Sequence, residues 1–164
     1  MELILKKMER QFKGKAGIKG WFTLRHIRNG DVIEERTINN TIVNAGLAQV
    51  AGLLLTDFGG TAFDYIAIGI GTTGATVTDT TLESEISTGG GERGTAVGTR
   101  ITTSVANDTA QLVTTFTFTG SFAVTESGIF NDASAGTMLS RQTFGAINVS
   151  SGDSIEVTWK IQVS

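Results

Sequence analysis

The segment closest to a ligand-binding motif is rich in glycine. Residues 69–74 read G-I-G-T-T-G, which matches the dinucleotide-binding fingerprint, and they follow an apolar run that is typical of a strand. The fingerprint binds a pyrophosphate only where the N-terminus of a helix follows the glycines directly. Here residues 75–78 (A-T-V-T) follow instead, and no series of alternating strands and helices surrounds the motif. We therefore interpret residues 69–74 as a turn and expect no cofactor.

Carboxylic acids that could act as a catalytic acid and base are Glu83, Glu85, Glu126, Asp132 and Asp153. General acid–base catalysis needs such groups within hydrogen-bond reach of one substrate, and no spacing in the sequence places two of them together. Glu83 has a simpler explanation, because Thr80, three positions earlier, completes a capping box. This pattern predicts a short helical turn that begins near Thr80 and ends near Ile86.

Metal and nucleophile chemistry find little support. The chain has no Cys and one His, which excludes thiolate and multi-histidine metal sites within one chain. The Asn131-Asp132 turn could hold Ca²⁺, but no other feature of the sequence supports such a site. No nucleophile elbow of the G-x-S-x-G type accompanies His26, so we interpret this residue as part of a strand. The sequence therefore predicts a protein that is not an enzyme.

Positive charge is concentrated near the N-terminus. Residues 1–36 contain nine basic and five acidic residues (+4), and the remainder contains four basic and eleven acidic residues (−7). A basic arm beside an acidic body predicts an electrostatic partner, which could be nucleic acid, an acidic protein surface or a neighbouring copy. Nucleic acid is disfavoured, because the aromatic residues are not interleaved with the lysines as a stacking surface requires. The residues expected to contact a partner protein are Lys6, Lys7, Arg10, Phe12, Lys13, Lys15, Lys19 and Trp21.

The rest of the sequence predicts short strands joined by tight turns, since Thr, Gly and β-branched residues are abundant and Pro is absent. A first hairpin over 21–38 turns at Asn29-Gly30, a pair that readily adopts the positive φ angles of a type I′ turn. Strands are also expected at 41–43, 65–70, 97–105, 112–119, 129–130, 138–144 and 155–163. Alternation is clearest in the last of these, and each strand is expected to have one wet face.

One helix is predicted after an N-cap at Asn44. Its apolar residues Leu47, Val50, Ala51 and Leu54 fall at i, i+3, i+4 and i+7, which gives one face to pack on a core. Residues 87–98, with three consecutive glycines, indicate a flexible loop. These patterns predict a mainly β fold, an antiparallel β-sandwich of jelly-roll-like type with one short helix. We expect a basic N-terminal arm over residues 1–20 and one sandwich domain over 21–164.

Most of the chain after residue 20 resembles small structural proteins of tailed bacteriophages. The resemblance is carried by G-W-F-T-L-R at 20–25, N-G-D-V at 29–32, N-T-I-V-N-A-G-L at 40–47, Y-I-A-I-G at 65–69 and T-L-E-S-E at 81–85. It continues with T-E-S-G-I-F-N at 125–131, M-L-S-R at 138–141 and the closing strand that begins G-D-S-I at 152–155. The basic arm is not part of the resemblance.

The resemblance implies a virion part, assembled in the host cytoplasm, and we expect a capsid decoration or cement protein that docks on the major capsid protein through residues 1–38. A closed homo-oligomer, such as a trimer, is a usual arrangement for such modules. The same sequence patterns also occur in tail-fibre, baseplate or neck modules, which are the alternative. A receptor- or carbohydrate-binding module would need exposed aromatic residues, for which the candidates are Trp21, Phe58, Phe63, Tyr65 and Phe122. No apolar run is long enough to cross a membrane, and the N-terminal one is too short for a signal peptide.

Overall fold

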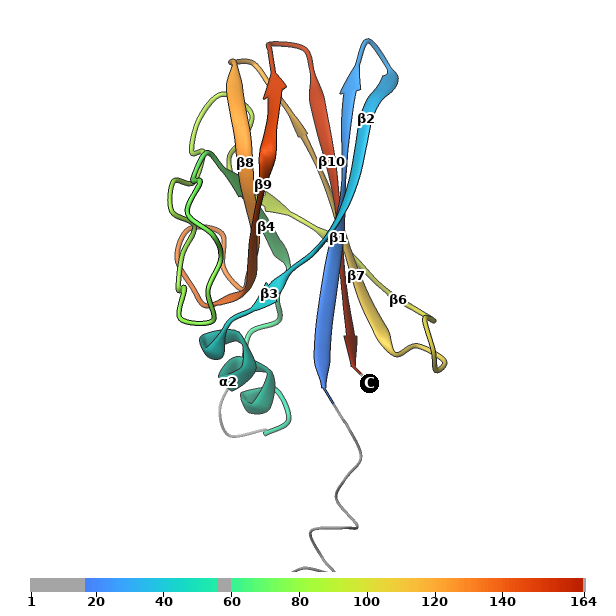
Figure 1. Ribbon diagram of the computed structural model, residues 1–164. Helices are drawn as coiled ribbons and strands as arrows, with labels where there is room; N and C mark the ends of the chain where they lie inside the picture. Colours follow the sequence, from blue (N-terminus) through green and yellow to red (C-terminus); the bar gives the residue numbers. More distant parts are fainter. Residues whose placement is uncertain (1–16, 56–59, 164) are drawn as a thin grey trace, which may run out of the picture.

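Two antiparallel five-stranded sheets face each other in the computed structural model, which describes residues 17–55 and 60–163 (Figure 1). Sheet A has the order β2-β1-β10-β7-β6 and sheet B the order β3-β9-β8-β4-β5. Sheet A contains β1 (Ile18–Arg28), β2 (Asp31–Asn39), β6 (Val97–Ile101), β7 (Thr109–Thr117) and β10 (Ser154–Val163). Sheet B contains β3 (Thr41–Ile42), β4 (Tyr65–Gly69), β5 (Gly94–Thr95), β8 (Phe122–Phe130) and β9 (Met138–Val149). The predicted antiparallel sandwich is confirmed.

The predicted turns form where the sequence places residues that tolerate positive φ. Asn29 and Gly30 have φ of 52° and 89° and join β1 to β2, as a type I′ hairpin requires. Gly152, with φ of 92°, lies in the turn between β9 and β10, and Asn107, with φ of 61°, precedes β7. Local turn chemistry therefore sets the ends of these strands.

The chain passes from one sheet to the other along both long edges of the sandwich. Asn40 joins β2 of sheet A to β3 of sheet B, and its N–H donates to the carbonyl of Gly20 at 3.1 Å. On the opposite edge Ala96 joins β5 to β6, and its N–H donates to the carbonyl of Asp64 at 2.7 Å. Residues 87–98, expected to be a flexible loop, thus contain β5 and the start of β6. Because both edges are bridged, the sandwich opens chiefly at its two ends.

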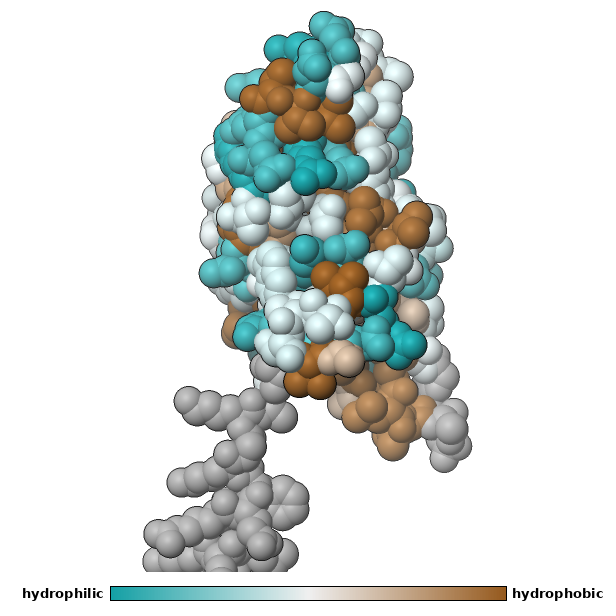
Figure 2. Space-filling model, turned by 90° about the vertical axis from the view of Figure 1, so that its right-hand side faces the viewer, coloured by the Kyte–Doolittle hydropathy of each residue, from teal (hydrophilic) through white to brown (hydrophobic). Residues whose placement is uncertain are grey.

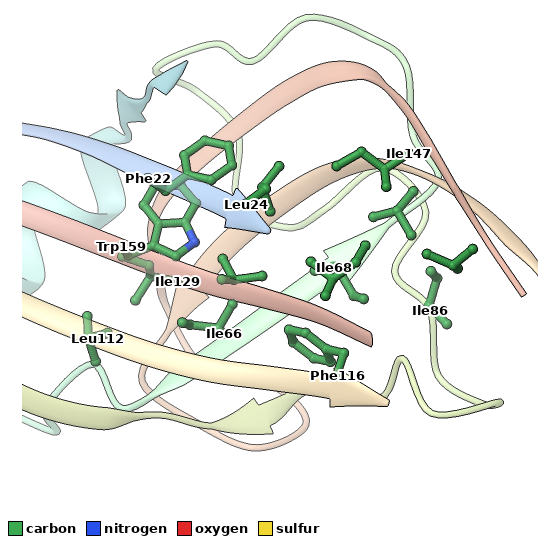
Figure 3. Close-up of a cluster of buried hydrophobic side chains, with 14 of the residues drawn as sticks. Phe22, Leu24, Ile66, Ile68, Ile86, Leu112, Phe116, Ile129, Ile147 and Trp159 are labelled. Atoms are coloured by element: carbon green, nitrogen blue, oxygen red, sulfur yellow. The ribbon is translucent and has the colours of Figure 1, made fainter. Parts of the chain in front are cut away.

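The core between the sheets is built around Trp159 of β10 (Figure 3). Trp159 is fully buried, and its ring stacks on Phe22 of β1 with centroids 4.3 Å apart. The indole N–H donates to the hydroxyl of Ser127 on β8 at 3.2 Å, and that hydroxyl donates to the carbonyl of Ala67 at 2.9 Å. The polar tip of the largest core side chain is therefore satisfied across the two sheets, as buried indoles require.

Sheet B is buried on both faces along β4, along β8 from Val124 and at the start of β9, which corrects the expectation that every strand has one wet face. Residues 70–86 run over its outer side, and Leu82 packs there in a second apolar cluster with Val43, Ala67, Phe130 and Met138. All residues of β8 from Val124 onward are buried. Sheet A keeps the expected alternation, for example along β10.

The helix α2 (Asn44–Gly52) is the one described helix, and its start differs from the prediction. Val43 occupies the N-cap position and makes no side-chain capping hydrogen bond. Gly46 is the buried helix residue, and it packs directly against β9. A Cβ at this position would lie 2.5 Å from the carbonyl oxygen of Leu139, so the close contact requires glycine. No helix among the described residues has the length and hydrophobicity to span a membrane.

Replacing Trp159 with Ala should lower the free energy of unfolding by about 3–5 kcal/mol, because a large buried side chain leaves a cavity. Urea unfolding followed by circular dichroism measures this loss. Trp21→Ala is the matched control, since Trp21 is only partly buried and points away from the core, and its loss should be about 1 kcal/mol. Equal losses in the two variants would contradict the central position of Trp159.

Candidate docking surface

The glycine-rich segment holds a carboxylate of the protein itself. The N–H of Gly71 donates to Glu126 at 3.0 Å, and the N–H groups of Glu83 and Ser84 donate to the same carboxylate at 3.0 and 2.7 Å. A Cβ on Gly69 or Gly71 would lie 2.5 Å from Glu126 Oε1, so the loop can cross the carboxylate only with glycine at both positions. No helix begins within residues 70–86, all of which the structure describes. The interpretation of a turn stands, and the backbone donors that a phosphate would use are taken.

Arg141 of β9 balances the charge of Glu126. Its Nε donates to Glu126 Oε2 at 2.9 Å, and the two side chains are 3% and 0% exposed. Arg141 also donates to Asp79 at 2.7 Å and to the carbonyl of Thr73 at 3.1 Å. Glu83 lies 3.8 Å from the same guanidinium and accepts the N–H of Thr73 at 2.7 Å. This cluster fastens residues 70–86 to the outer side of sheet B.

The predicted helical turn over residues 80–86 is absent. Glu83 binds Thr73 instead of reaching back to cap a helix, and these hydrogen bonds hold the pKa of Glu83 below its ordinary value. Burial raises the pKa of Asp79, but hydrogen bonds from Thr76 and Arg141 outweigh it and the net shift is downward. Sequence reasoning missed Asp79 and Arg141. The signal for Arg141 was a charged residue inside a segment that was expected to form a strand.

A second, partly buried cluster joins the β1–β2 hairpin to the turn before β10. The carboxylate of Asp153 accepts Arg28 at 2.8 and 2.7 Å, His26 Nε2 at 3.1 Å and the N–H of Ser150 at 3.0 Å. Hydrogen bonds from Arg28 lower the pKa of Asp153, against burial, with help from Ser150 and His26. Among the described residues, no hydroxyl lies within hydrogen-bond distance of His26 as a nucleophile would. The cluster closes this end of the sandwich, which we call the turn end.

The Asn131-Asp132 turn is held by protein donors. The carboxylate of Asp132 accepts the N–H of Ser134 at 3.1 Å, and backbone hydrogen bonds lower its pKa, that of Ser134 first. Arg93 donates to the carbonyl of Asp132 at 2.8 Å and pairs with Glu85 at 2.6 Å. A guanidinium at this position opposes a Ca²⁺ ion. Over residues 17–55 and 60–163, no group of three or more His, Asp or Glu side chains is arranged to hold a metal ion.

The opposite end, where β1 begins and β10 ends, has an apolar cleft of about 590 Å³ between sheet A and α2. We call this the open end. Its walls include Ile18, Val50, Leu53, Phe63, Ile161 and Val163. Beside it Leu54 is 83% exposed and Leu55 is 55% exposed. Figure 2 shows hydrophobic residues gathered at this end, in the lower part of the view.

The apolar helix residues contribute to the open end instead of the core. Val50 packs partly against the core, but Leu47 is 44% exposed, Ala51 is exposed and Leu54 lies beyond the end of α2. The prediction of a helix is confirmed and the prediction of its buried face is wrong. Contiguous exposed apolar surface of this kind marks interaction sites.

The predicted docking residues are divided by the structure. Lys6, Lys7, Arg10, Phe12, Lys13 and Lys15 lie outside the described residues. Lys19 and Trp21 lie in β1, which begins at Ile18, within the residues expected to form the arm. The hairpin turn at Asn29-Gly30 lies at the turn end (Figure 1). Since β1 has 11 residues, and a strand rises about 3.3 Å per residue, this turn and residue 17 lie at opposite ends of the sandwich.

The aromatic candidates for a carbohydrate site give no exposed platform. Trp21, Phe63, Tyr65 and Phe122 are each partly buried, and Phe58 lies outside the described residues. Stacking on a sugar ring needs an accessible ring face, so the described surface does not favour this type of site.

Glu126→Gln should lower the free energy of unfolding by about 3–5 kcal/mol, because breaking a buried ion pair leaves Arg141 poorly compensated. Urea unfolding gives the value. In a double variant with Arg141→Met the losses should be less than additive. Glu35→Gln is the control, since this paired side chain is 51% exposed, and it should cost no more than about 1 kcal/mol. A loss for Glu126→Gln as small as this control would refute the role of the cluster.

Acid should destabilise the protein through Asp153. Its pKa in the folded protein lies below the ordinary 3.8, so its contribution is complete above about pH 4 and is lost as the pH falls toward the folded pKa. Asp153→Asn should therefore show a shallower loss of unfolding free energy than the wild type between about pH 4 and pH 2. Denaturant unfolding at several pH values measures both slopes. Asp31→Asn, an exposed change on β2, should keep the wild-type slope, and an unchanged slope in Asp153→Asn would count against the argument.

The described residues thus offer three internally paired polar clusters, around Glu126, Asp132 and Asp153, and an open apolar surface. The clusters satisfy their charges internally, and the open end leaves apolar side chains uncovered. Comparisons with protein-family models, with curated proteins and with solved structures found no match to this chain.

Proposed function

We propose that the chain is a non-enzymatic structural protein of a virion, a capsid decoration protein that attaches to the major capsid protein through its open end. The observation that supports this most directly is the apolar cleft beside the exposed Leu54 and Leu55. Interfaces take most of their affinity from a few apolar anchors that fill such pockets. The resemblance of segments such as 40–47 and 125–131 to phage structural proteins supports a place in a virion.

Charge indicates the partner's chemistry. Residues 1–16 contain five basic and two acidic residues, and they enter the described structure at Gly17, next to Ile18 in the wall of the cleft. Lys19 is exposed on β1. We propose that the partner inserts an apolar segment into the cleft and surrounds it with acidic residues. Such complementarity fixes the register of a complex more than its affinity.

Particles of the phage that encodes this chain, prepared without it, test the proposal when the purified protein is added back. Leu54→Glu should weaken attachment at least about tenfold, since it places a charge on the exposed residue that follows Leu53 of the cleft wall, while the folded domain keeps its stability. Val32→Glu is the matched control, because Val32 is 52% exposed and lies in the hairpin at the turn end. Co-sedimentation gives the affinity, and cryo-electron microscopy gives the position.

Wild-type attachment by Leu54→Glu would refute the open end as the docking surface. Density at the tail in place of the shell would instead identify a tail-fibre, baseplate or neck module. A truncation that removes residues 1–16 tests the arm. The truncation should stop at residue 16, because Ile18 and Lys19 pair with Val163 and Gln162 of β10. Removing residues 1–19 would damage sheet A.

A further inference from the structure

The two edge strands of sheet A differ in how they discourage pairing with another chain. Natural edge strands are protected by charges and bulges. On one edge, β2 carries the charged residues Asp31, Glu34, Glu35 and Arg36, and its pairing with β1 is interrupted between His26 and Ile27. On the other edge, β6 reads V-G-T-R-I and has one charge, Arg100. Its residue Val97 is 69% exposed.

The outer edge of β6 also has unused hydrogen-bonding groups. β6 pairs with β7 in regular register from Val97 opposite Val113 to Ile101 opposite Thr109. In the part of the chain that the structure describes, no hydrogen bond reaches the backbone of residues 97–101 from any other element. In an antiparallel strand alternate N–H and C=O groups point away from the neighbour, so this edge can accept another strand.

We propose that β6 pairs antiparallel with β6 of a second copy, so that the two sheets A form one continuous sheet across a two-fold axis at Thr99. In this register Val97 lies opposite Ile101 of the second copy, and Thr99 lies opposite Thr99. Apolar pairs and Thr–Thr pairs are favourable cross-strand neighbours. Arg100 lies opposite Gly98, so like charges do not face each other directly.

The inner side of the edge has room for the second copy's Arg100. A Cβ built on Gly98 meets no atom within 4 Å. An incoming guanidinium therefore meets no obstruction at this edge. The other edge strand of sheet A, β2, does not favour pairing with its own copy. Self-pairing of β2 about its central residue places Glu35 directly opposite Glu35, which is destabilising. The two-fold contact is isologous and gives a dimer, not the trimer considered from the sequence.

The absence of Cys from the chain allows a direct test by disulfide formation. Thr99→Cys introduces one thiol per copy, and antiparallel pairing brings the two Cα atoms to about 4.5–5.5 Å, within the range that a disulfide spans. Under mild oxidation, this variant should form a covalent dimer at least about tenfold faster than Thr37→Cys, an exposed site on β2. Equal rates for the two variants would overturn the proposal.

Sedimentation of the full chain supplies a second test. The wild type should form dimers, and Thr99→Glu should raise the dimer dissociation constant at least about tenfold, because two carboxylates then face each other. Thermal unfolding of dilute samples checks that this exposed change leaves the fold intact. A wild type that stays monomeric, or that forms trimers unaffected by Thr99→Glu, would overturn the proposal. No particle is needed, so failure here leaves capsid attachment standing, and failure of capsid attachment leaves the dimer standing.

Discussion

The covering of sheet B depends on one buried carboxylate. Glu126 has no solvent exposure, and such a charge is tolerated only where donors and an opposite charge surround it. Residues 70–86 supply those donors, because irregular backbone has N–H groups that no helix or sheet satisfies. The dependence is mutual, since an apolar side chain at position 126 would leave three N–H groups without their acceptor. Arg141 then completes the arrangement by balancing the charge and by binding the carbonyl of Thr73.

Sheet A has no such cover, and this difference decides which surfaces are free. On its outer face Thr23 bonds to Thr37, and Arg25 pairs with both Glu35 and Glu156. These groups are satisfied within the sheet, so the face needs no neighbour. The crossings at residues 40 and 96 bridge the long edges, and Asp153 closes the turn end. The open end and the outer side of β6 both present exposed apolar side chains.

Local patterns predicted the elements whose conformation depends only on neighbouring residues and on simple exposure to solvent or core. The alternation of β10 and the Asn29-Gly30 turn belong to this class, because a strand with one wet face and a tight turn need no distant information. Local patterns predicted only the end of β8, at residues 129–130. The polar residues that lie between apolar neighbours in the rest of this strand break the alternation. Ser127 serves Trp159 on one face, and Glu126 serves the covering loop on the other. The helix shows the opposite error. The spacing of its apolar residues predicted a buried face, but Leu54 is exposed in the described structure.

The glycine-rich loop shows why a matching motif did not indicate a ligand. Glycines let a backbone approach an anion closely, and N–H groups then bind its oxygens. Neither property specifies whether the anion is a phosphate or a carboxylate. That choice is made here by Glu126, 55 positions from Gly71 in the sequence, where the pairing of β4 with β8 places Glu126 opposite Gly69. The deciding residue is set by strand register across the sheet, so the chemistry of the loop followed from the fold and could not be read from the loop.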